Sequence, residues 1–239
     1  MRKLLFSLLL LSSIVFGDNV DEAEKYFNSA FTHHSSGDYS SAIKDFSKAI
    51  ELNPNLHQAY YNRGISYKAL KDYSSAIKNY TQAIKLNPNF ADAYNNRGNA
   101  YQTLKDYSSA IQDYTQAIKL NPNYDKAYNN RGFAYANLKD YSLAIQDYTQ
   151  AIKLNPNFAD AYYNRGLAYD DLKDYSLAIK DYTQAITLNP NFADAYNNRG
   201  LAYVLSSKYS LATKDARKAC SLGDCKVLEF MGKNGLIRD

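Results

Sequence analysis

The stretch ADAYNNRGNAYQTLKDYSSAIQDYTQAIKLNPNY, residues 91–124, is one copy of a 34-residue segment that recurs along the chain. The tripeptide Asn-Pro-Asn marks the period, because successive copies of its proline lie 34 residues apart, at Pro54, Pro88, Pro122, Pro156 and Pro190. Six repeats follow one another without a gap, at 23–56, 57–90, 91–124, 125–158, 159–192 and 193–226. A fixed period of this length predicts a repeat architecture in which neighbouring copies stack.

Each repeat has the pattern of two helices joined by a turn. We number positions within a repeat from 1, so that positions 4, 8 and 11 of repeat 3 are Tyr94, Gly98 and Tyr101. At about 100° per residue, these three residues fall on one face of a first helix. Asp106 is placed to cap a second helix. The proline at position 32 ends that second helix, because proline lacks an amide hydrogen and restricts the residue before it.

Position 8 is glycine in repeats 2 to 6, at Gly64, Gly98, Gly132, Gly166 and Gly200. Glycine inside a helix costs about 1 kcal/mol relative to alanine. Its recurrence therefore indicates a close helix contact that a side chain would block, and we assign these glycines a structural role.

The residue types at positions 4, 8, 11, 20, 24, 27 and 32 resemble the tetratricopeptide repeat family, being aromatic, small, aromatic, alanine, aromatic, alanine and proline. The resemblance implies an all-α fold, a right-handed superhelix (solenoid) of six helix-turn-helix repeats. Position 7 departs from the family, because repeats 2 to 6 have arginine where leucine is usual. Repeat 1 departs further, with Ser29, Ala30 and His33 at positions 7, 8 and 11. The C-terminal Ala-Cys-Ser-Leu-Gly-Asp also resembles Sel1-like relatives, although the strict period favours the plain tetratricopeptide form.

The segment after repeat 6 differs from the other junctions, because Cys220 and Cys225 flank Ser-Leu-Gly-Asp in place of Asn-Pro-Asn. Gly223 is placed to end one helix and Asp224 to cap the next, so a local disulfide is favoured and two free thiols are the alternative. We expect residues 225–239 to form a C-terminal cap. Its apolar residues are spaced to cover the last hairpin: Val227, Leu228, Phe230 and Met231.

If positions 4, 8 and 11 face the stack, the opposite side of each first helix is left uncovered. Positions 2, 6, 9 and 13 lie on that opposite side, and we call the surface they form the groove. Position 6 is asparagine in every repeat: Asn28, Asn62, Asn96, Asn130, Asn164 and Asn198. An amide donates and accepts hydrogen bonds, so this row could pair with the backbone of an extended chain. The resemblance likewise implies a concave surface that binds peptides, while asparagines that only bond to the neighbouring helix are the alternative.

Apolar residues extend the candidate groove. Position 9 includes Phe133, Leu167 and Leu201, and position 5 includes Tyr61 and Tyr163, which could anchor a partner. The alternative is that the position 9 side chains pack between first helices or beneath the C-terminal cap. Acidic residues at position 2 favour a neutral or basic partner: Glu24, Asp92, Asp160 and Asp194. The lysine and arginine clamp by which some family members bind a terminal carboxylate is missing at positions 5 and 6.

The arginines at position 7 also need partners. Position 23 is acidic in every repeat but the second, where it is Asn79. Because repeat 1 has the acid but no arginine, we predict that each acid pairs with the arginine of the following repeat, as in Asp113 with Arg131. Such pairs would be structural, since a partly buried arginine normally has an acidic partner.

The first residues have the layout of a secretory signal. Arg2 and Lys3 precede an apolar run from Leu4 to Phe16, and small Gly17 precedes a polar residue. We expect a signal peptide at 1–17 and an exported protein, periplasmic or secreted, with an uncleaved anchor as the alternative. No later apolar segment is long enough to span a bilayer, so we expect no stable membrane insertion after cleavage.

Composition narrows the function classes. Without Arg2 and Lys3, 26 of the 28 basic residues remain against 24 acidic ones, and no Lys/Arg run exceeds two, so we expect no nucleic-acid partner. The histidines number only three, and no phosphate loop or nucleophile elbow is present, so we expect no enzyme, cofactor or metal. The resemblance implies a scaffold for another protein, bound as an extended or helical segment. The alternatives are a structural subunit of a cell-envelope complex that binds through its outer face, or a glycan binder.

Overall fold

The computed structural model describes residues 20–238, and all regular secondary structure in that range is helical. A helix over residues 20–35 comes first. It is followed by α2 (Tyr39–Leu52), α3 (His57–Ala69), α4 (Tyr73–Leu86), α5 (Ala91–Thr103), α6 (Tyr107–Leu120), α7 (Asp125–Asn137), α8 (Tyr141–Leu154), α9 (Ala159–Asp171), α10 (Tyr175–Leu188), α11 (Ala193–Leu205), α12 (Tyr209–Ser221) and α13 (Lys226–Lys233). The prediction of an all-α chain of helix pairs is confirmed. The proposed signal at 1–17 lies outside the described residues.

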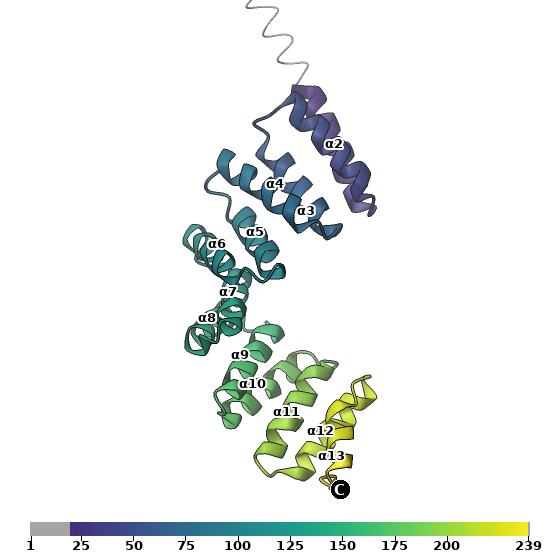
Figure 1. Cartoon of the computed structure of the whole chain (residues 1–239), viewed down its shortest axis with the longest axis vertical. Coiled ribbons are helices and arrows are strands. Elements are labelled where there is room, and N and C mark those ends of the chain that lie inside the picture. The colour runs from purple at the N-terminus through teal and green to yellow at the C-terminus, as the bar shows by residue number, and fades with distance from the viewer. Residues whose placement is uncertain (1–19, 239) are drawn as a thin grey trace, which may run out of the picture. The chain divides into compact units, whose positions relative to one another are not determined.

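The helices form two compact units, with the boundary between Asn121 and Pro122. The first unit contains repeats 1 and 2 and both helices of repeat 3, and the second contains repeats 4 to 6 with the C-terminal segment. Within each unit every helix packs on the next one, as Figure 1 shows for α3, α4 and α5. The first helices of neighbouring repeats also touch, α3 with α5 in the first unit, then α7 with α9 and α9 with α11 in the second. Each unit is therefore a stack of hairpins.

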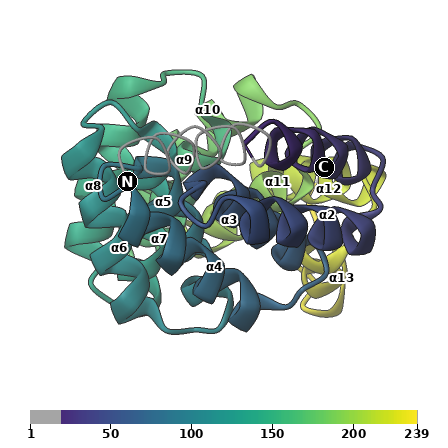
Figure 2. The same ribbon diagram turned by 90° about the horizontal axis from the view of Figure 1, so that it is seen from above.

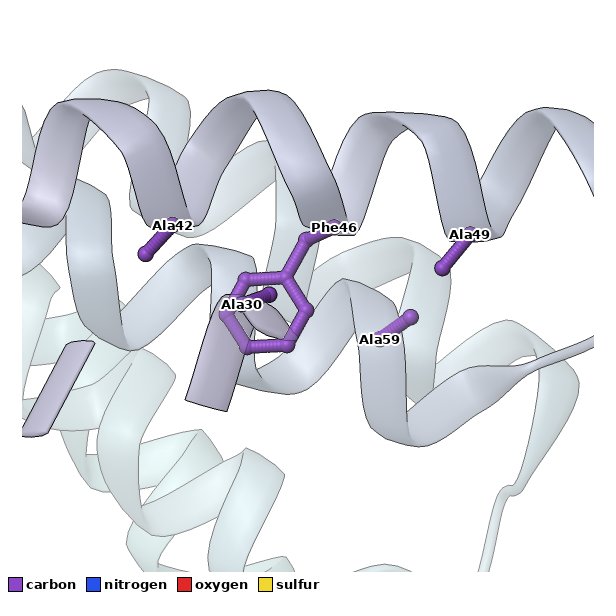
Figure 3. Close-up of a cluster of buried hydrophobic side chains, with 5 residues drawn as sticks. All are labelled: Ala30, Ala42, Phe46, Ala49 and Ala59. Carbon is purple, nitrogen blue, oxygen red and sulfur yellow. The ribbon is translucent and has the colours of Figure 1, made fainter. Parts of the chain in front are cut away.

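Small residues and one aromatic ring form the core of each hairpin. In repeat 1, Phe46 of α2 projects onto Ala30, with Ala42, Ala49 and Ala59 around it (Figure 3). All five are fully buried. Repeats 2 to 5 have a tyrosine in place of Phe46, and each is buried to the same degree: Tyr80, Tyr114, Tyr148 and Tyr182.

The glycine at position 8 makes room for this ring. A Cβ atom on Gly98 would lie 2.7 Å from Cε1 of Tyr114, and one on Gly166 would lie 2.7 Å from Cε1 of Tyr182. Real Cβ atoms do not approach carbon so closely, so the structure supports the predicted contact. The neighbour is the ring of the repeat's own second helix.

The turns explain where the helices begin and end. Asp106 Oδ1 accepts a hydrogen bond from the Ser109 amide at 3.1 Å, which confirms the predicted N-cap of α6. Before that cap, Lys105 has φ 63°. Lysine in this left-handed region costs about 1 kcal/mol, and repeat 1 avoids the cost with Gly37, φ 84°. The lysine conformation was not predicted.

The C-terminal segment covers the last hairpin, since α13 lies against α11 and α12 (Figure 1, Figure 2). Val227 and Met231 are buried against Ala212 and Ala216. Phe230, in contrast, is 45% exposed, so its predicted role in the cap is wrong. The Phe230 side chain lies on the exposed side of the short helix α13, whereas Val227 and Met231 lie on its buried side.

Cys220 and Cys225 are bonded in a disulfide that spans the turn between α12 and α13. Gly223 has φ 99° and ends α12, as its position suggested. The N-cap of α13 is Cys225 rather than Asp224, although Asp224 Oδ1 still accepts from the Lys226 amide at 3.3 Å.

Candidate functional site

The arginine at position 7 ties the two helices of its own repeat together. Arg97 donates through Nε and Nη2 to the two carboxylate oxygens of Asp113, at 2.8 and 2.7 Å. Although burial lowers it, the hydrogen bonds and charge of Asp113 raise the pKa of Arg97, whereas burial raises the pKa of Asp113 against the opposing effect of Arg97. The guanidinium carbon also lies 5.6 Å from the ring centre of Tyr94, within cation–π range.

The predicted pairing between repeats is therefore wrong. Asp113 pairs with Arg97 of its own repeat, and Arg131 pairs with Asp147 at 2.7 Å. The two helices of a hairpin run antiparallel, which brings position 23 opposite position 7. Repeat 1 has no arginine because Ser29 serves instead, donating to Asp45 at 2.6 Å.

The arginine does reach the preceding repeat, but it meets a hydroxyl group there. Arg97 Nη1 donates to Thr81 Oγ1 at 2.9 Å, and Arg165 Nη1 donates to Thr149 Oγ1 at 2.9 Å. One side chain thus links both helices of its own repeat to the second helix of the repeat before. This network is structural and leaves the first-helix edge free for another task.

The asparagines at position 6 lie on that edge and bond sideways. Asn96 Nδ2 donates to the Tyr61 hydroxyl at 2.8 Å and Asn198 Nδ2 to the Tyr163 hydroxyl at 2.9 Å. Asn164 Nδ2 donates to Asn129 Oδ1 at 3.1 Å. Position 6 therefore pairs with position 5 of the preceding repeat.

These asparagines are neither sealed nor fully free. Asn28 is exposed, whereas Asn62 is half-buried and donates to its own helix at Gln58 O, 2.8 Å away. The remaining four, Asn96, Asn130, Asn164 and Asn198, are half-buried. The amide oxygen of Asn96 accepts from Lys68 Nζ at 3.3 Å, so both ends of that amide are bonded within the protein. Both roles considered from the sequence therefore fit the geometry.

Tyr61 and Tyr163 pack against side chains at the junction with the next repeat, so their rings are held in place. Tyr61 packs on Phe90 with ring centres 4.6 Å apart, and Tyr163 packs on Phe192 at 4.7 Å. Burial, then the charges of Asp92 and Asp194, raise the pKa of each tyrosine to about 12, against the opposing effect of the asparagine hydrogen bonds. Both hydroxyl groups therefore remain protonated at neutral pH.

The position 9 side chains differ in accessibility. Phe133 is 39% exposed, and Leu167 is half-buried beside it. Leu201 packs in the cluster that contains Val227 and Met231, so the C-terminal cap covers it. Leu201 thus belongs to the cap and not to the open groove.

A hollow of about 190 Å³ opens in the second compact unit between α7 and α9, above the ring of Tyr148 on α8. Its lining residues are Phe133, Ala136, Asn137, Tyr148, Asn164, Leu167, Ala168 and Asp171. Three of them, Phe133, Asn164 and Leu167, were groove candidates from the sequence. The structure brings these three together.

Comparison with known proteins places residues 32–214 in one family. Profiles described as "Tetratricopeptide repeat" match residues 91–124, 125–158 and 159–192, and residues 181–214. A profile described as "TPR repeat" matches residues 32–71 and 66–105. The chain belongs to the tetratricopeptide repeat family. No curated protein matches the chain in sequence.

Solved structures of this family share the fold. A crystal structure of MamA is 27% identical with a TM-score of 0.65, covering 69% of this chain and 96% of that chain. YrrB, described as a TPR protein with an unusual peptide-binding site, is 23% identical with a TM-score of 0.66. The likeness covers 79% of this chain and 97% of that chain. pilF of Pseudomonas aeruginosa is 17% identical with a TM-score of 0.77, and the likeness covers 90% of this chain and 99% of that chain. The last two likenesses concern the fold alone.

This tetratricopeptide repeat chain also exposes leucines near the turn between the two helices of a repeat, a feature that was not predicted from the sequence. We call the exposed leucines at positions 14 and 19 of repeats 4 to 6 the leucine edge: Leu138, Leu143, Leu172, Leu177 and Leu211. Each is at least 39% exposed. The signal was present, because repeats 1 to 3 have serine at position 19 where repeats 4 to 6 have leucine.

The three histidines lie apart in the tetratricopeptide repeat stack. His33 Nε2 is 3.7 Å from Asp45, His34 Nδ1 is 2.9 Å from Ser66 Oγ, and His57 packs on Phe90. Within residues 20–238 no three His, Cys, Asp or Glu side chains are placed to hold a metal ion. In the same range, no helix has the length and apolar character needed to cross a membrane.

Proposed function

We propose that this tetratricopeptide repeat protein is a non-catalytic scaffold that holds an extended segment of another protein in the groove. The carrying observation is the exposure of first-helix side chains that the fold does not need. Phe31 is 54% exposed and Phe133 39% exposed, at a position the helix could fill with a polar residue, as Asn99 does. Exposed aromatic rings beside amide oxygens suit a polypeptide, which offers apolar side chains and backbone N–H donors.

The likeness to solved structures supports the same proposal. The MamA likeness covers most of this chain, and the YrrB structure is described as having a peptide-binding site. Charge sharpens the expectation, because Asp92, Asp160 and Asp194 are exposed along the groove. A neutral or basic segment would meet these carboxylates favourably, and an acidic one would not.

We also propose that the protein is exported to the periplasm or secreted. This rests on the basic, apolar and small-residue order of residues 1–17. The disulfide between Cys220 and Cys225 is consistent with an oxidising compartment. N-terminal sequencing of the protein recovered from the envelope and the medium tests it, and an intact Met1 in the cytoplasm would contradict it.

The groove is tested on an array of short synthetic peptides of random sequence. The groove variant carries Phe31→Asn and Phe133→Asn, which copies Asn99 at two exposed sites and so preserves the fold. The control variant carries Leu143→Ser, Leu177→Ser and Leu211→Ser, which copies the serine of repeats 1 to 3. We expect the groove variant to lose the peptides that wild type binds and the control variant to keep them.

The leucine edge favours one second candidate, a structural subunit that binds its partner through the outer face. Large exposed apolar side chains gathered on one edge often mark an interaction surface. The same variants separate the two functions. Binding that survives the groove variant but is lost in the leucine variant would assign the protein to the second.

A further inference from the structure

The hydroxyl group of the buried tyrosine at position 24 is satisfied differently from one repeat to the next. Tyr114 donates to Asn99 Oδ1 at 2.8 Å and to Gln102 Oε1 at 3.1 Å, both on its own first helix. Tyr182 donates to Asp170 Oδ2 at 3.0 Å, again on its own first helix. The hydroxyl group therefore bonds to acceptors at positions 9 and 12 in repeat 3 and to the acceptor at position 12 in repeat 5.

Repeat 4 has no such cover. Positions 9 and 12 are Phe133 and Ala136, and neither side chain can accept a hydrogen bond. Tyr148 is 1% exposed, and it lines the hollow that the small side chain of Ala136 leaves open. Among residues 20–238, the buried position 24 hydroxyl group that lacks a partner is that of Tyr80 in repeat 2. Tyr148 instead lines an open hollow, which gives a ligand from outside access to it.

The other polar groups of the hollow offer oxygen atoms. Asn137 Nδ2 donates to Phe133 O at 2.9 Å, and Asn164 Nδ2 donates to Asn129 Oδ1 at 3.1 Å. Each amide thus turns its nitrogen toward the protein. Asp171 adds an exposed carboxylate, and none of the lining residues is basic. A ligand rich in donors and positively charged would complement this set, whereas a carboxylate would be repelled.

The hollow also has apolar walls and room for a side chain. Phe133 and Leu167 face it from α7 and α9. Its volume of about 190 Å³ far exceeds the roughly 15 Å³ that one water needs. An alkyl chain could lie between these walls, and a cation near the Phe133 ring would gain a cation–π interaction.

We propose that this hollow is a subsite for one lysine or arginine side chain of the segment bound in the groove. The proposal rests on the proposed function and adds the chemistry of the ligand. The alkyl stem packs between Phe133 and Leu167. The charged end bonds to the oxygens of Asn137, Asn164 and Asp171, and the Tyr148 hydroxyl lies at the floor.

The probe is Nα-acetyl-lysine N-methylamide, and the uncharged norleucine analogue is its control. Both are titrated into the full chain while the methyl NMR signals of Ala136 and Leu167 are followed. We expect the lysine compound to shift both signals with a dissociation constant on the order of 1 mM. The norleucine compound should bind at least about fivefold more weakly, because it lacks the charge.

Three variants locate the effect, with Leu167 as the reporter. Ala136→Gln copies Gln102 of repeat 3, fills the hollow and gives Tyr148 an acceptor, so it should abolish the shift. Asp171→Asn should weaken binding about two- to fivefold, the range of an exposed ion pair. Glu229→Gln removes one exposed charge on α13 and should change nothing. Should Ala136→Gln fail to fold, Phe133→Asn replaces it.

Equal shifts from the lysine and norleucine compounds, unchanged binding in Ala136→Gln, or no shift at all would overturn the proposal. Its failure is distinguishable from failure of the groove. Peptides that bind the array with no preference for basic residues would leave the proposed function standing and remove only the subsite. A lysine compound that binds the hollow while no peptide binds the protein would remove the proposed function instead.

Discussion

Repeats 3 and 4 have the same framework and different grooves. Both pair a 13-residue first helix with a 14-residue second helix. Both close an arginine to aspartate pair at 2.7 Å, Arg97 with Asp113 and Arg131 with Asp147. Among the positions where they differ are 9 and 12, where Asn99 and Gln102 give way to Phe133 and Ala136. Those two substitutions remove the acceptors that bond to the Tyr114 hydroxyl in repeat 3, and in repeat 4 a hollow opens at Tyr148.

This difference separates residues that build the stack from residues that can select a ligand. The glycine, the position 24 ring and the ion pair are buried and recur in both repeats. Position 9 belongs to the groove, position 12 lines the hollow beside it, and both vary without changing a helix boundary. Framework changes should therefore affect the two repeats equally, and groove changes should affect binding in one of them.

The largest expected effect comes from breaking the ion pair. Asp113→Ala and Asp147→Ala should each lower the free energy of unfolding by about 3 kcal/mol, because each leaves a partly buried arginine without its partner. Asp113→Asn should cost less, since Asn79 already accepts from Arg63 Nε at 2.8 Å in repeat 2. Urea unfolding followed by circular dichroism measures this. A loss in one repeat but not the other would break the comparison.

Alanine at position 8 should cost somewhat less. Gly98→Ala and Gly132→Ala place a Cβ atom 2.7 and 2.9 Å from Cε1 of the ring below. We expect each to destabilise by about 1 to 3 kcal/mol, which outweighs the gain of about 1 kcal/mol in helix propensity.

Gly200→Ala is the matched control for this clash. Repeat 6 has Ala216 in place of the ring, and the nearest atoms lie 3.5 Å from the added Cβ. This variant should therefore be neutral or more stable than wild type in the same urea experiment. Destabilisation there as large as in repeat 3 would show that crowding by the ring is not the cause.

Exchanging the groove residues should change stability little and binding strongly. Phe133→Asn with Ala136→Gln gives Tyr148 the acceptors of repeat 3 and should stabilise by about 0.5 to 1.5 kcal/mol, the value of a hydrogen bond. The reverse exchange, Asn99→Phe with Gln102→Ala, should destabilise repeat 3 by a similar amount. Thermal unfolding of both variants checks this. Equal behaviour of the two would mean that positions 9 and 12 do not control the hydroxyl group.

The smallest effect per residue is the loss of stability at alkaline pH. This loss should be the same with and without the exchange of Phe133→Asn with Ala136→Gln. Burial, and then the charge of the neighbouring aspartate, raise the pKa of Tyr114 and Tyr148 above the ordinary value of 10. Their stabilising contribution is therefore complete below pH 10 and is lost as pH rises toward the folded pKa. At pH 10 the loss is about 0.4 kcal/mol per tyrosine.

Melting temperatures between neutral pH and pH 10 measure this loss. Wild type and the Phe133→Asn with Ala136→Gln variant should lose stability in parallel, because the ring stays buried in both. A fall in melting temperature toward pH 10 that differs between wild type and the variant would contradict this. It would show that the groove residues, and not burial in the framework, control the titration of Tyr148.

The framework was largely predictable because it repeats. A proline every 34 residues, a glycine that costs helix propensity and an aspartate before each second helix have one simple explanation each. The ion pairs were harder, because Asp113 lies 16 residues from one arginine and 18 from the next. Only the hairpin geometry decides between them. The lone acid of repeat 1 misled the prediction, since Ser29 holds it.

The groove was less predictable because its features depend on pairs of side chains. That Asn96 bonds to Tyr61 follows from how neighbouring first helices sit, which one sequence does not give. The hollow arises because Phe133 and Ala136 together fail to cover Tyr148. Leu201 looked open for the same reason, until α13 covered it. The sequence thus predicted which side of the first helices is the candidate groove, but not the local shape of that side.

The most direct test of the central claim is where a bound peptide touches the protein. We would add the strongest peptide from the array to the full chain with labelled methyl groups and compare Leu167 in the groove with Leu143 and Leu177 on the leucine edge. We expect the Leu167 signals to shift and the signals of Leu143 and Leu177 to stay unchanged. Shifts at Leu143 and Leu177 with Leu167 unchanged would contradict it.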